Sequence, residues 1–498
     1  MKNLYFFSVF VVATCGLIYE LVAGALASYL LGDSVTQFST IIGCYLFAMG
    51  VGSYLSKFIK QNLVNFFVKV EILIGLFGGL SAAILFLLFD QVSSFRLVLY
   101  IIVFIIGMFV GIEIPLIMRI LKDEIEFNDL VSKIFSFDYI GALFASLLFP
   151  LVLVPHLGLI RTALLFGMLN VGVAFFTLVY FQKRYNWSKS LLVSAIFSFG
   201  VLFVAFVLGE RLTDWVENMS YGDKVVYSHS TSYQKILITQ AGDETKLFLN
   251  GNLQFSSRDE YRYHESLVHP ALAALSNPVN VLIFGGGDGL AAREILKYPS
   301  VQKIVLVDLD RKMTEIFSKN DFLTKLNQHS LSSEKLEIVN QDAFIWIKEN
   351  KLKFDFIVVD FPDPANFSLG KLYSLTFYRY LLNTLNEGGL AVIQSTSPYV
   401  ARKSFWCIDQ TLREAGFLTN PYHSYVPSFG EWGYIIASKE SYKKPLKFPP
   451  DLKFVSIDTL KSFFEFPSDM NYVNVASNKL NNQNLVKYFE DEWAVYAH

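Results

Sequence analysis

The chain has 498 residues, of which 53% are hydrophobic and only 17% are charged, and its mean hydropathy is positive. This composition excludes a single soluble domain and indicates a chain that is partly embedded in a membrane. The formal net charge of -2 argues against nucleic acid as a partner, because nucleic-acid-binding surfaces are basic. Cys15, Cys44 and Cys407 lack the spacing of a metal site or a disulfide framework, so we expect no metal ion.

The apolar residues are concentrated in the first part of the chain. Seven segments have roughly the 20-residue length that crosses the hydrocarbon core of a bilayer. They are residues 4–31, 37–56, 66–89, 98–119, 139–159, 162–181 and 190–209. The first is too long and too poorly flanked for a cleaved signal peptide. We therefore expect residues 1–210 to form a seven-span α-helical membrane domain.

Four ionisable residues interrupt these apolar segments. Glu20 and Glu113 lie inside spans, where a charge is costly and marks either a structural hydrogen bond or a transport or ligand role. Lys69 and Glu71 lie near the start of a span. We expect this second pair at the interface, with side chains that reach toward water.

The composition after Gly222 is that of a soluble protein. Residues 222–275 contain short alternating runs and the hairpin signal Asn250-Gly251, which predict a small antiparallel β domain. Residues 276–440 alternate apolar runs with helical segments. The runs are residues 281–284, 304–308, 336–339, 355–360 and 390–395. This order predicts a doubly wound, mostly parallel α/β domain of the Rossmann-like, methyltransferase type. Residues 441–498 form a C-terminal extension to which no role is assigned.

The most informative motif is Gly285-Gly286-Gly287-Asp288-Gly289, which directly follows the first predicted strand of the α/β domain. Glycines allow a sharp turn and a close approach of a ligand to the backbone. Asp308 follows about 20 residues later at the tip of the next strand, where an acid binds the hydroxyls of a ribose. The motif therefore favours a nucleoside site, although a glycine-rich turn in any α/β protein is the alternative.

Three more acids follow predicted strands of this domain. Asp342 is suited either to an adenine contact or to the N-cap of a helix. Asp360 and Asp363 lie in Val359-Asp360-Phe361-Pro362-Asp363-Pro364, which is either an anionic pocket for a polycation or a simple turn. Strand ends of a parallel sheet meet at one edge, so we expect Asp308, Asp342 and Asp360 to lie close to the glycine turn.

Taken together, several motifs in order resemble the spermidine synthases, or polyamine aminopropyltransferases. They are Tyr233-Gln234, the hairpin LNGNLQ, Asp259-Glu260 with Tyr263-His264-Glu265, GGGDG, Asp308, Gln341-Asp342-Ala343 and the D-x-x-D-P run. The resemblance covers about residues 222–440, and the apolar front looks like the membrane-attached bacterial branch of the family.

The resemblance implies a role for each matched residue. Asp360 matches the proton acceptor. The nucleoside site matches Gln234, Gly285, Gly287, Asp308, Asp342 and Ala343. The polyamine and aminopropyl groups are lined by Tyr263, His264, Asp288 and Asp363, and we add Glu431 and Trp432 as further candidates. For His264 alone, a hydrogen-bonded structural histidine is the alternative.

The implied reaction moves the aminopropyl group of decarboxylated S-adenosylmethionine to putrescine, giving spermidine and 5′-methylthioadenosine without a prosthetic group. Expected partners are putrescine or a related diamine and the lipid bilayer, and a homo-oligomer is compatible with this assignment. Two departures from the family's motifs concern the nucleoside contact after Asp363 and the choice of acceptor, which is putrescine, cadaverine or a longer polyamine. Ala365-Asn366 follows Asp363-Pro364 in place of the family's usual Gly-Pro, and residues 426–434 carry Phe429, Glu431 and Trp432 where soluble members have a tyrosine-containing loop.

Two other function classes compete with this one. The first is a methyltransferase that uses intact S-adenosylmethionine, which Asp288 disfavours because an acid repels the carboxylate that this cofactor keeps. The second is a membrane transporter or sensor of polyamines whose soluble domain only binds, which Glu20 and Glu113 keep open.

The charges of the loops make a further prediction about orientation. Loops after the second, fourth and sixth spans carry Lys57, Lys60, Arg119, Lys122, Lys133, Lys183, Arg184 and Lys189, whereas the others carry only Arg96 and Arg161. This bias puts the N-terminus in the cytoplasm, so seven spans would put the catalytic domain outside. The co-substrate is cytosolic in the family, however. We therefore expect a cytoplasmic catalytic domain at the inner membrane, with either 4–31 or 139–159 not crossing.

Overall fold

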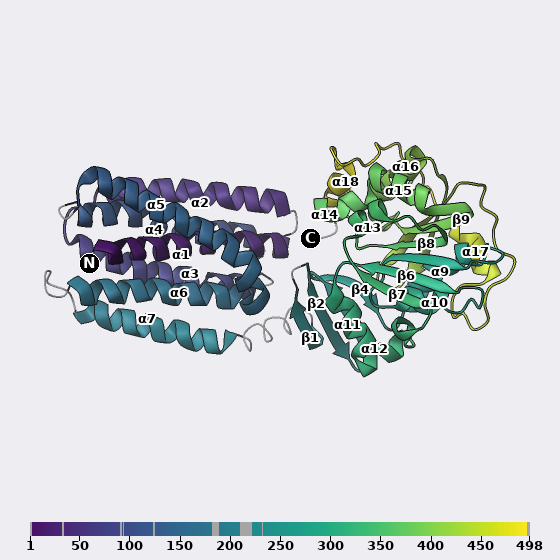
Figure 1. The fold of residues 1–498 in the computed structure, drawn as a ribbon, viewed down its shortest axis with the longest axis horizontal. Coiled ribbons are helices and arrows are strands. Elements are labelled where there is room, and N and C mark those ends of the chain that lie inside the picture. Colours follow the sequence, from purple (N-terminus) through teal and green to yellow (C-terminus); the bar gives the residue numbers. More distant parts are fainter. Residues whose placement is uncertain are drawn as a thin grey trace. The chain divides into compact units, whose positions relative to one another are not determined.

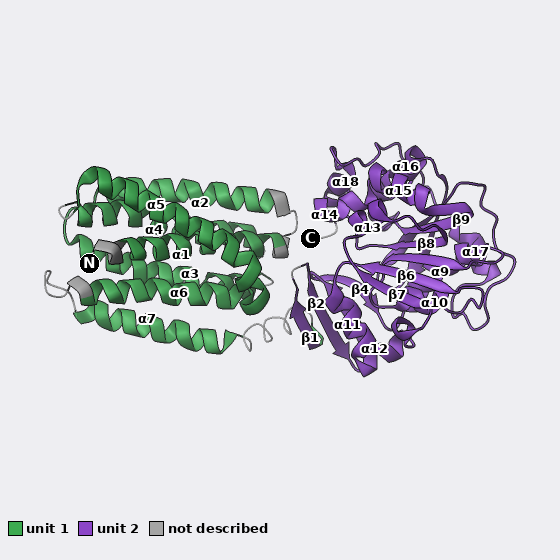
Figure 2. Ribbon diagram, viewed as in Figure 1, with its two compact units in different colours: residues 1–225 green, residues 226–498 purple. Residues whose placement is uncertain are grey.

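The structure, a computed structural model, describes residues 2–31, 34–89, 92, 94–122, 125–181, 189–209, 222–231 and 233–495. The chain divides into two compact units, residues 1–225 and 226–498 (Figure 2). The first is helical and corresponds to the predicted membrane domain. The second contains the two predicted β-containing domains and also the C-terminal extension, so these three form one unit.

The described part of the first unit is a bundle of long helices (Figure 1). They are α1 (Lys2–Leu31), α2 (Ser34–Ser56), α3 (Leu63–Leu88), α4 (Phe95–Leu121), α5 (Phe127–Leu148), the π turn η1 (Phe149–Leu153), α6 (Val154–Phe181) and α7 (Lys189–Val207). Six helical segments of the described chain are long and apolar enough to cross a membrane. One of them, Phe127–Val179, has 53 residues and covers the two predicted spans 139–159 and 162–181.

The fifth predicted span differs from the structure at both ends. The helix already begins at Phe127, because a polar first part that includes Asp129 and Lys133 is helical as well. The chain passes Pro150 in a π turn, where the N–H of Val154 bonds to the carbonyl of Phe149 and the usual hydrogen-bond register is interrupted. The helical backbone breaks instead at Gly158, whose φ of 71° favours glycine.

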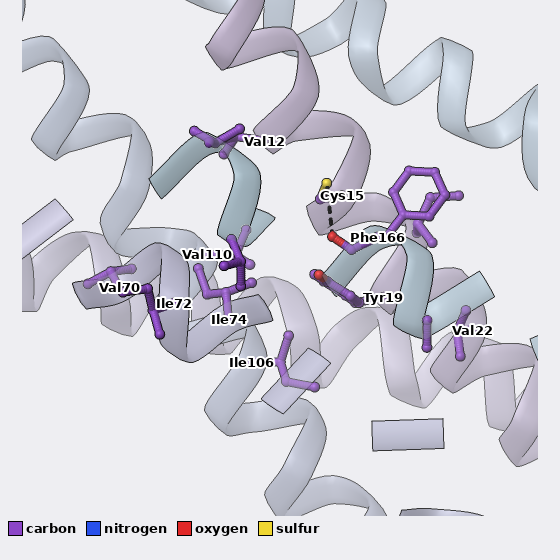
Figure 3. Close-up of a cluster of buried hydrophobic side chains, with 14 of the residues drawn as sticks. Val12, Cys15, Tyr19, Val22, Val70, Ile72, Ile74, Ile106, Val110 and Phe166 are labelled. Atoms are coloured by element: carbon purple, nitrogen blue, oxygen red, sulfur yellow. Dashed lines mark hydrogen bonds between the residues drawn. The ribbon is translucent and has the colours of Figure 1, made fainter. Parts of the chain in front are cut away.

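The bundle has an apolar interior and an apolar outer surface. Figure 3 shows part of the interior, where aliphatic side chains such as Val70, Ile74 and Val110 belong to one buried cluster with Tyr19. Large apolar side chains also cover the outside, and Phe197 is 72% exposed. Glu71 does not lie at an interface as expected from its position near a span start. It is fully buried, because the face of α3 that carries it packs against α6 and α4.

The second unit begins with a four-stranded sheet in the order β1-β2-β3-β4. Its strands are β1 (Lys224–Ser230), β2 (Lys235–Ala241), β3 (Glu244–Leu249) and β4 (Asn252–Ser256). The predicted hairpin is confirmed. Asn250 and Gly251 both have positive φ, 50° and 84°, as the mirror-image two-residue turn requires.

A seven-stranded sheet forms the centre of this unit, in the order β10-β11-β9-β8-β5-β6-β7. The five predicted strands are confirmed as the parallel part: β5 (Asn280–Gly285), β6 (Lys303–Asp308), β7 (Leu336–Asn340), β8 (Phe354–Asp360) and β9 (Leu385–Gln394). Two strands were not predicted, β10 (Leu418–Val426) and β11 (Gly430–Ser438), and they pair antiparallel. The edge position of β10 tolerates Pro421, which masked the strand pattern.

Helices cover both faces of this sheet, so the predicted doubly wound arrangement is confirmed. One apolar layer contains Val281 and Ile283 of β5, and the other contains Leu282 and Phe284. The helices are α9 (Glu260–Leu272), α10 (Leu290–Ile295), α11 (Arg311–Lys319), α12 (Asp321–Leu326), α13 (Ala343–Glu349), α14 (Phe367–Gly370), α15 (Leu375–Thr384) and α16 (Arg402–Ala415), with the 3-10 turns η2 (Ser330–Ser332) and η3 (Lys371–Tyr373).

The C-terminal extension adds α17 (Ile457–Phe463) and α18 (Asn484–Trp493) to this unit. Buried polar side chains hold it in place. The Glu265 carboxylate accepts the N–H groups of Lys453, Phe454 and Val455 at 2.8–2.9 Å. Glu492 of α18 accepts the N–H groups at the start of α16. The extension is therefore part of the packed α/β domain rather than a separate tail.

Candidate active site

The glycine turn joins β5 to α10 at the carboxyl end of the sheet. Gly285, Gly286 and Gly289 all have positive φ, between 64° and 79°, which explains why this turn needs glycine. A Cβ on Gly286 would lie 3.5 Å from Oδ2 of Asp360. The backbone of the turn therefore passes directly beside the carboxylate at the end of β8, as predicted for neighbouring parallel strands.

Asp308, at the tip of β6, faces the same turn. Its Oδ2 accepts the N–H of Gly287 at 3.1 Å, and its Oδ1 accepts the N–H of Asp310 at 2.9 Å. A Cβ on Gly287 would lie 2.6 Å from this carboxylate, so only glycine fits. Burial raises the pKa of Asp308 to about 7. The carboxyl group is thus held at the strand tip, beside the glycine turn.

Asp360, at the end of β8, is bound by a tyrosine from α9. The Tyr263 hydroxyl donates to its Oδ1 at 2.5 Å. Burial raises the pKa of Asp360 to about 6, with His264 and the Tyr263 hydroxyl acting in the opposite direction. A carboxyl group with this pKa is ionised at neutral pH and is a stronger base than an ordinary aspartate.

His264, on α9, is buried beside these acids. Its Nδ1 lies 2.8 Å from the Glu260 carbonyl and 2.9 Å from the Glu260 carboxylate, so this nitrogen carries the proton. Burial acts to lower the pKa of His264, but Glu260, Asp288 and Asp360 outweigh it and the pKa is raised. His264 is therefore a buried, hydrogen-bonded histidine that also lies among the acids of the site. A structural role and a role in the site are both compatible with this position.

A buried ion network supports His264 from behind. Arg293 of α10 binds both carboxylate oxygens of Glu260 at 2.8 and 2.9 Å, and its Nε donates to Glu294 at 2.8 Å. Glu294 in turn contacts His269 at 2.8 Å. The bidentate geometry fixes Glu260, and through it the ring of His264.

The remaining acids of the α9 motif hold backbone segments. Asp259 accepts the N–H and hydroxyl of Ser428 at 2.7 and 2.9 Å, which ties down the turn between β10 and β11. Glu265 anchors the C-terminal extension, as described above. The motif thus combines site residues, Tyr263 and His264, with residues that position neighbouring loops.

Asp288 and Asp363 complete the group of acids. Asp288 is buried, and its Oδ1 accepts the N–H of Leu290 at 2.8 Å. Asp363 accepts Nε2 of Gln394 at 3.0 Å and the Thr396 hydroxyl at 3.3 Å. Burial raises the pKa of Asp363 to about 6. Asp288 is therefore held by its own turn, whereas Asp363 is held by residues at the end of β9.

Gln234 and Asp342 lie near the ends of β6 and β7. Nε2 of Gln234, from the loop before β2, donates to Asp310 at 3.2 Å, close to Asp308. Asp342 caps α13 through the N–H of Phe344, and it pairs with Lys371 at 2.6 Å. Partial burial acts to raise the pKa of Asp342, but these two contacts outweigh it and the pKa is lowered. Ala343 follows directly as the first residue of α13.

Glu431 and Trp432 have different environments, because consecutive residues of β11 point to opposite faces. Trp432 is buried and stacks on Phe429, whose ring lies 6.1 Å from that of Tyr263. Glu431 contacts His423 at 2.8 Å instead. The structure therefore brings Trp432 to the Tyr263 side of the sheet but does not bring Glu431 there.

Several residues of the site were not found from the sequence. Arg293, Lys371, Gln394 and Thr396 each bind one of the predicted acids. No spacing rule links them to those acids in the chain. The only signal in the sequence for Arg293 is its position on α10, the short helix that directly follows the glycine turn.

Comparisons with known proteins agree with this geometry. A Spermine/spermidine synthase domain matches residues 260–447. The chain is 49% identical over 493 residues to a polyamine aminopropyltransferase of Leptospira interrogans, with 99% of both chains covered. It is 52% identical over 495 residues to polyamine aminopropyltransferase 2 of Ralstonia nicotianae, covering 98% of this chain and 97% of that one. This chain belongs to the polyamine aminopropyltransferase family.

The relatives match along the whole chain, so the helical unit is shared with them as well as the catalytic unit. A spermidine synthase crystallised with the transition-state analogue AdoDATO is 28% identical, covers 49% of this chain and 85% of its own, and has a TM-score of 0.46. As a member of the family, this chain is an enzyme that transfers an aminopropyl group from decarboxylated S-adenosylmethionine, and aminopropyl transfer replaces the methyltransferase alternative.

Proposed function

We propose that this aminopropyltransferase uses putrescine as the acceptor and that Asp360 is the proton acceptor. The observation that carries the proposal is the half-buried Asp360 carboxylate, which is bound by Tyr263 and lies beside the glycine turn. An alkylamine resembles lysine, with a pKa of about 10.4, so it arrives protonated at neutral pH. Asp360 accepts one proton from the reacting nitrogen, whose lone pair then becomes available.

The reaction forms one bond and breaks one. The free amine attacks the aminopropyl carbon next to the sulfonium, a carbon–nitrogen bond forms, and the carbon–sulfur bond breaks. The electron pair of that bond stays on sulfur, so 5′-methylthioadenosine leaves as a neutral thioether. Asp308 and Gln234 are assigned to the nucleoside, Asp288 to the aminopropyl ammonium and Asp363 to the distal ammonium of the diamine. The rate then depends mainly on holding nitrogen and carbon in line.

The aromatic side of the site suits an aliphatic chain between two charges. Tyr263, Phe429 and Trp432 form consecutive ring contacts of 6.1 and 5.0 Å. Such a row of rings suits the methylene groups of a diamine, while acids at either end bind its ammonium groups. This arrangement favours a short diamine over a single amine.

The test uses purified full-length protein with decarboxylated S-adenosylmethionine and a panel of putrescine, cadaverine and spermidine, with products identified by mass. Asp360→Asn is expected to lose about 10²–10⁴-fold in turnover while still binding methylthioadenosine. Near-normal turnover of this variant at neutral pH would remove Asp360 as the base. A preference for cadaverine or spermidine would overturn putrescine as the acceptor.

We also propose that the helical unit lies in a lipid bilayer, with the catalytic unit in the cytoplasm. Support comes from the apolar helices and from the exposed apolar side chains on the outside of the bundle, such as Phe47, Leu151 and Phe197. Exposed apolar surface of this extent is typical of a lipid-facing bundle. Membrane fractionation with and without alkaline carbonate is the test, since a peripheral protein would be released into the supernatant.

A further inference from the structure

The helical unit contains a buried polar cluster that the aminopropyl transfer does not use. Glu71 of α3 and Glu113 of α4 are 0% and 1% exposed in the middle of an apolar bundle. Each carboxyl group lies beside the other. A buried ionisable pair inside a membrane-type bundle is costly and marks a functional site by default.

Two further side chains organise this pair. Nδ2 of Asn170, on α6, donates to Oε2 of Glu71 at 2.8 Å. The Tyr19 hydroxyl of α1 donates to Oδ1 of Asn170 at 3.2 Å. Four helices thus contribute to one polar cluster, in which hydrogen bonds join Tyr19, Asn170 and Glu71, and Glu113 lies beside Glu71.

One oxygen of each of the two carboxyl groups lacks a hydrogen-bond partner among the described residues. Oε1 of Glu71 and Oε1 of Glu113 are both buried, and neither has a hydrogen-bond partner within the described residues. Neither carboxyl group has an ion pair there either, although both are close to complete burial. A ligand is therefore expected on these oxygens, since a buried acceptor without a partner costs about 1–3 kcal/mol.

The groups around the pair exclude a fixed cation as that ligand. The titratable residues that act on it from the neighbouring helices are Cys15, Tyr19, Tyr45 and Asp138. None of them is basic. The Tyr45 hydroxyl donates to the carbonyl of Gly16 at 2.8 Å, and the Cys15 thiol donates to the carbonyl of Phe166 at 3.7 Å (Figure 3).

We propose that Glu71 and Glu113 form a proton-binding site, in which one exchangeable proton is shared between the two carboxyl groups. Two neighbouring carboxylates in an apolar bundle cannot both be ionised, and one proton shared by their unpartnered oxygens removes one charge and supplies the missing ligand. A metal ion fits less well, because hard cations take six or more oxygen ligands and this pair with Asn170 supplies fewer. Chains of acids in membrane bundles are the groups that pumps and transporters use to pass protons. This site gives the helical unit a proton-handling role that is separate from aminopropyl transfer.

Infrared spectroscopy of the full-length protein in detergent at pH 7 tests the site. The measurement is the carbonyl stretch of an un-ionised carboxyl group, taken as the difference between the wild-type protein and the Glu71→Gln, Glu113→Gln double variant. We expect a difference band worth one protonated carboxyl group, which shifts in D₂O because the proton exchanges. The double variant should keep its aminopropyl transfer activity and its helical circular dichroism.

Three results would overturn the proposal: no difference band, a band worth two protonated groups, or a band that sodium ions abolish at constant pH. If the double variant fails to fold, Asn170→Ala provides the second measurement. Loss of the Asn170 donor should move the carboxyl band to a different frequency, because one oxygen of Glu71 loses its partner. An unchanged band in that variant would also contradict a site on Glu71.

Discussion

The hydroxyl group of Tyr263 donates a hydrogen bond of 2.5 Å to Oδ1 of Asp360, although 97 residues separate the two in the chain. Tyr263 comes from α9 and Asp360 from the end of β8. The hydrogen bond stabilises the ionised form of Asp360 and opposes the effect of burial on its pKa. The tyrosine therefore affects both the pKa and the orientation of Asp360, the proposed base.

Tyr263→Phe should raise the pKa of Asp360 further, since burial then acts with less opposition. We expect turnover at pH 7 to fall by about two-fold and its acid limb to move to higher pH, because less of the base is ionised. The measurement is turnover at saturating substrates against pH. Tyr422→Phe is the control, because its hydroxyl bonds to the backbone carbonyl of Ser266 and not to Asp360. An acid limb that stays in place would show that Tyr263 only fills space.

Asp360 should also make folding stability depend on pH. Its folded pKa, about 6, lies above the ordinary value of 3.8, so the folded state holds this proton more tightly than the unfolded state. Its contribution to stability is complete below about pH 4 and is lost as pH rises toward 6. Asp360→Asn has no carboxyl group that ionises at this position, so its stability does not fall with pH for this reason. We expect the variant to be as stable as the wild type at pH 4 and more stable by up to about 3 kcal/mol at pH 7.5.

The measurement is the thermal unfolding midpoint of wild type and Asp360→Asn at both pH values. Comparing the two proteins at each pH removes the contribution of every other titrating group. A variant that is less stable at pH 7.5 would mean that the carboxylate is better solvated than its burial indicates.

Asp288→Asn should separate the two charged parts of the co-substrate. The amide oxygen of asparagine can still accept the N–H of Leu290, so the turn keeps its cap. The lost charge should weaken decarboxylated S-adenosylmethionine by about 10–100-fold, since only this ligand carries the propylammonium group. Methylthioadenosine should bind almost as before. Titration calorimetry with both ligands decides the point, and an equal loss for both would assign Asp288 to the shape of the loop.

Arg293→Met should destabilise the catalytic unit strongly. The substitution leaves Glu260 and Glu294 buried without their common partner, which costs about 3–5 kcal/mol. Arg258→Met is the matched control, because the Arg258 side chain is 62% exposed where it pairs with Asp243, and such pairs contribute less than about 1 kcal/mol. Thermal unfolding midpoints of both variants provide the comparison. Similar losses in the two variants would contradict the importance of the buried network.

A cytoplasmic catalytic unit predicts activity of a cytoplasm-specific reporter fused after His498. Residue 186 lies outside the described residues, and cysteine labelling near it locates the preceding loop. If the reporter and the loop near residue 186 are both in the cytoplasm, segment 190–209 does not cross the membrane. The 53-residue segment Phe127–Val179 would make about 80 Å of continuous helix, far more than one passage of about 30 Å, so its break at Gly158 is the second place to probe. An external reporter would overturn the cytoplasmic assignment.

The sequence by itself determined the elements whose signals are local. Buried parallel strands need continuous apolar runs, so the five strands from β5 to β9 were visible as such runs. Positive φ restricts the residue type, so the glycine turn and the Asn250-Gly251 hairpin could be predicted as well. Because parallel strands share one carboxyl edge, the approach of Asp360 to that turn followed directly.

Only the tertiary structure decided which partner each acid has. Arg293 binds Glu260, and Lys371 binds Asp342, through contacts between separate elements that no spacing in the chain encodes. The register of β11 places Trp432 and Glu431 on opposite faces, which a sequence without a recognised strand could not show. The burial of Glu71 has the same origin, because the side of a helix that faces its neighbours is set by packing.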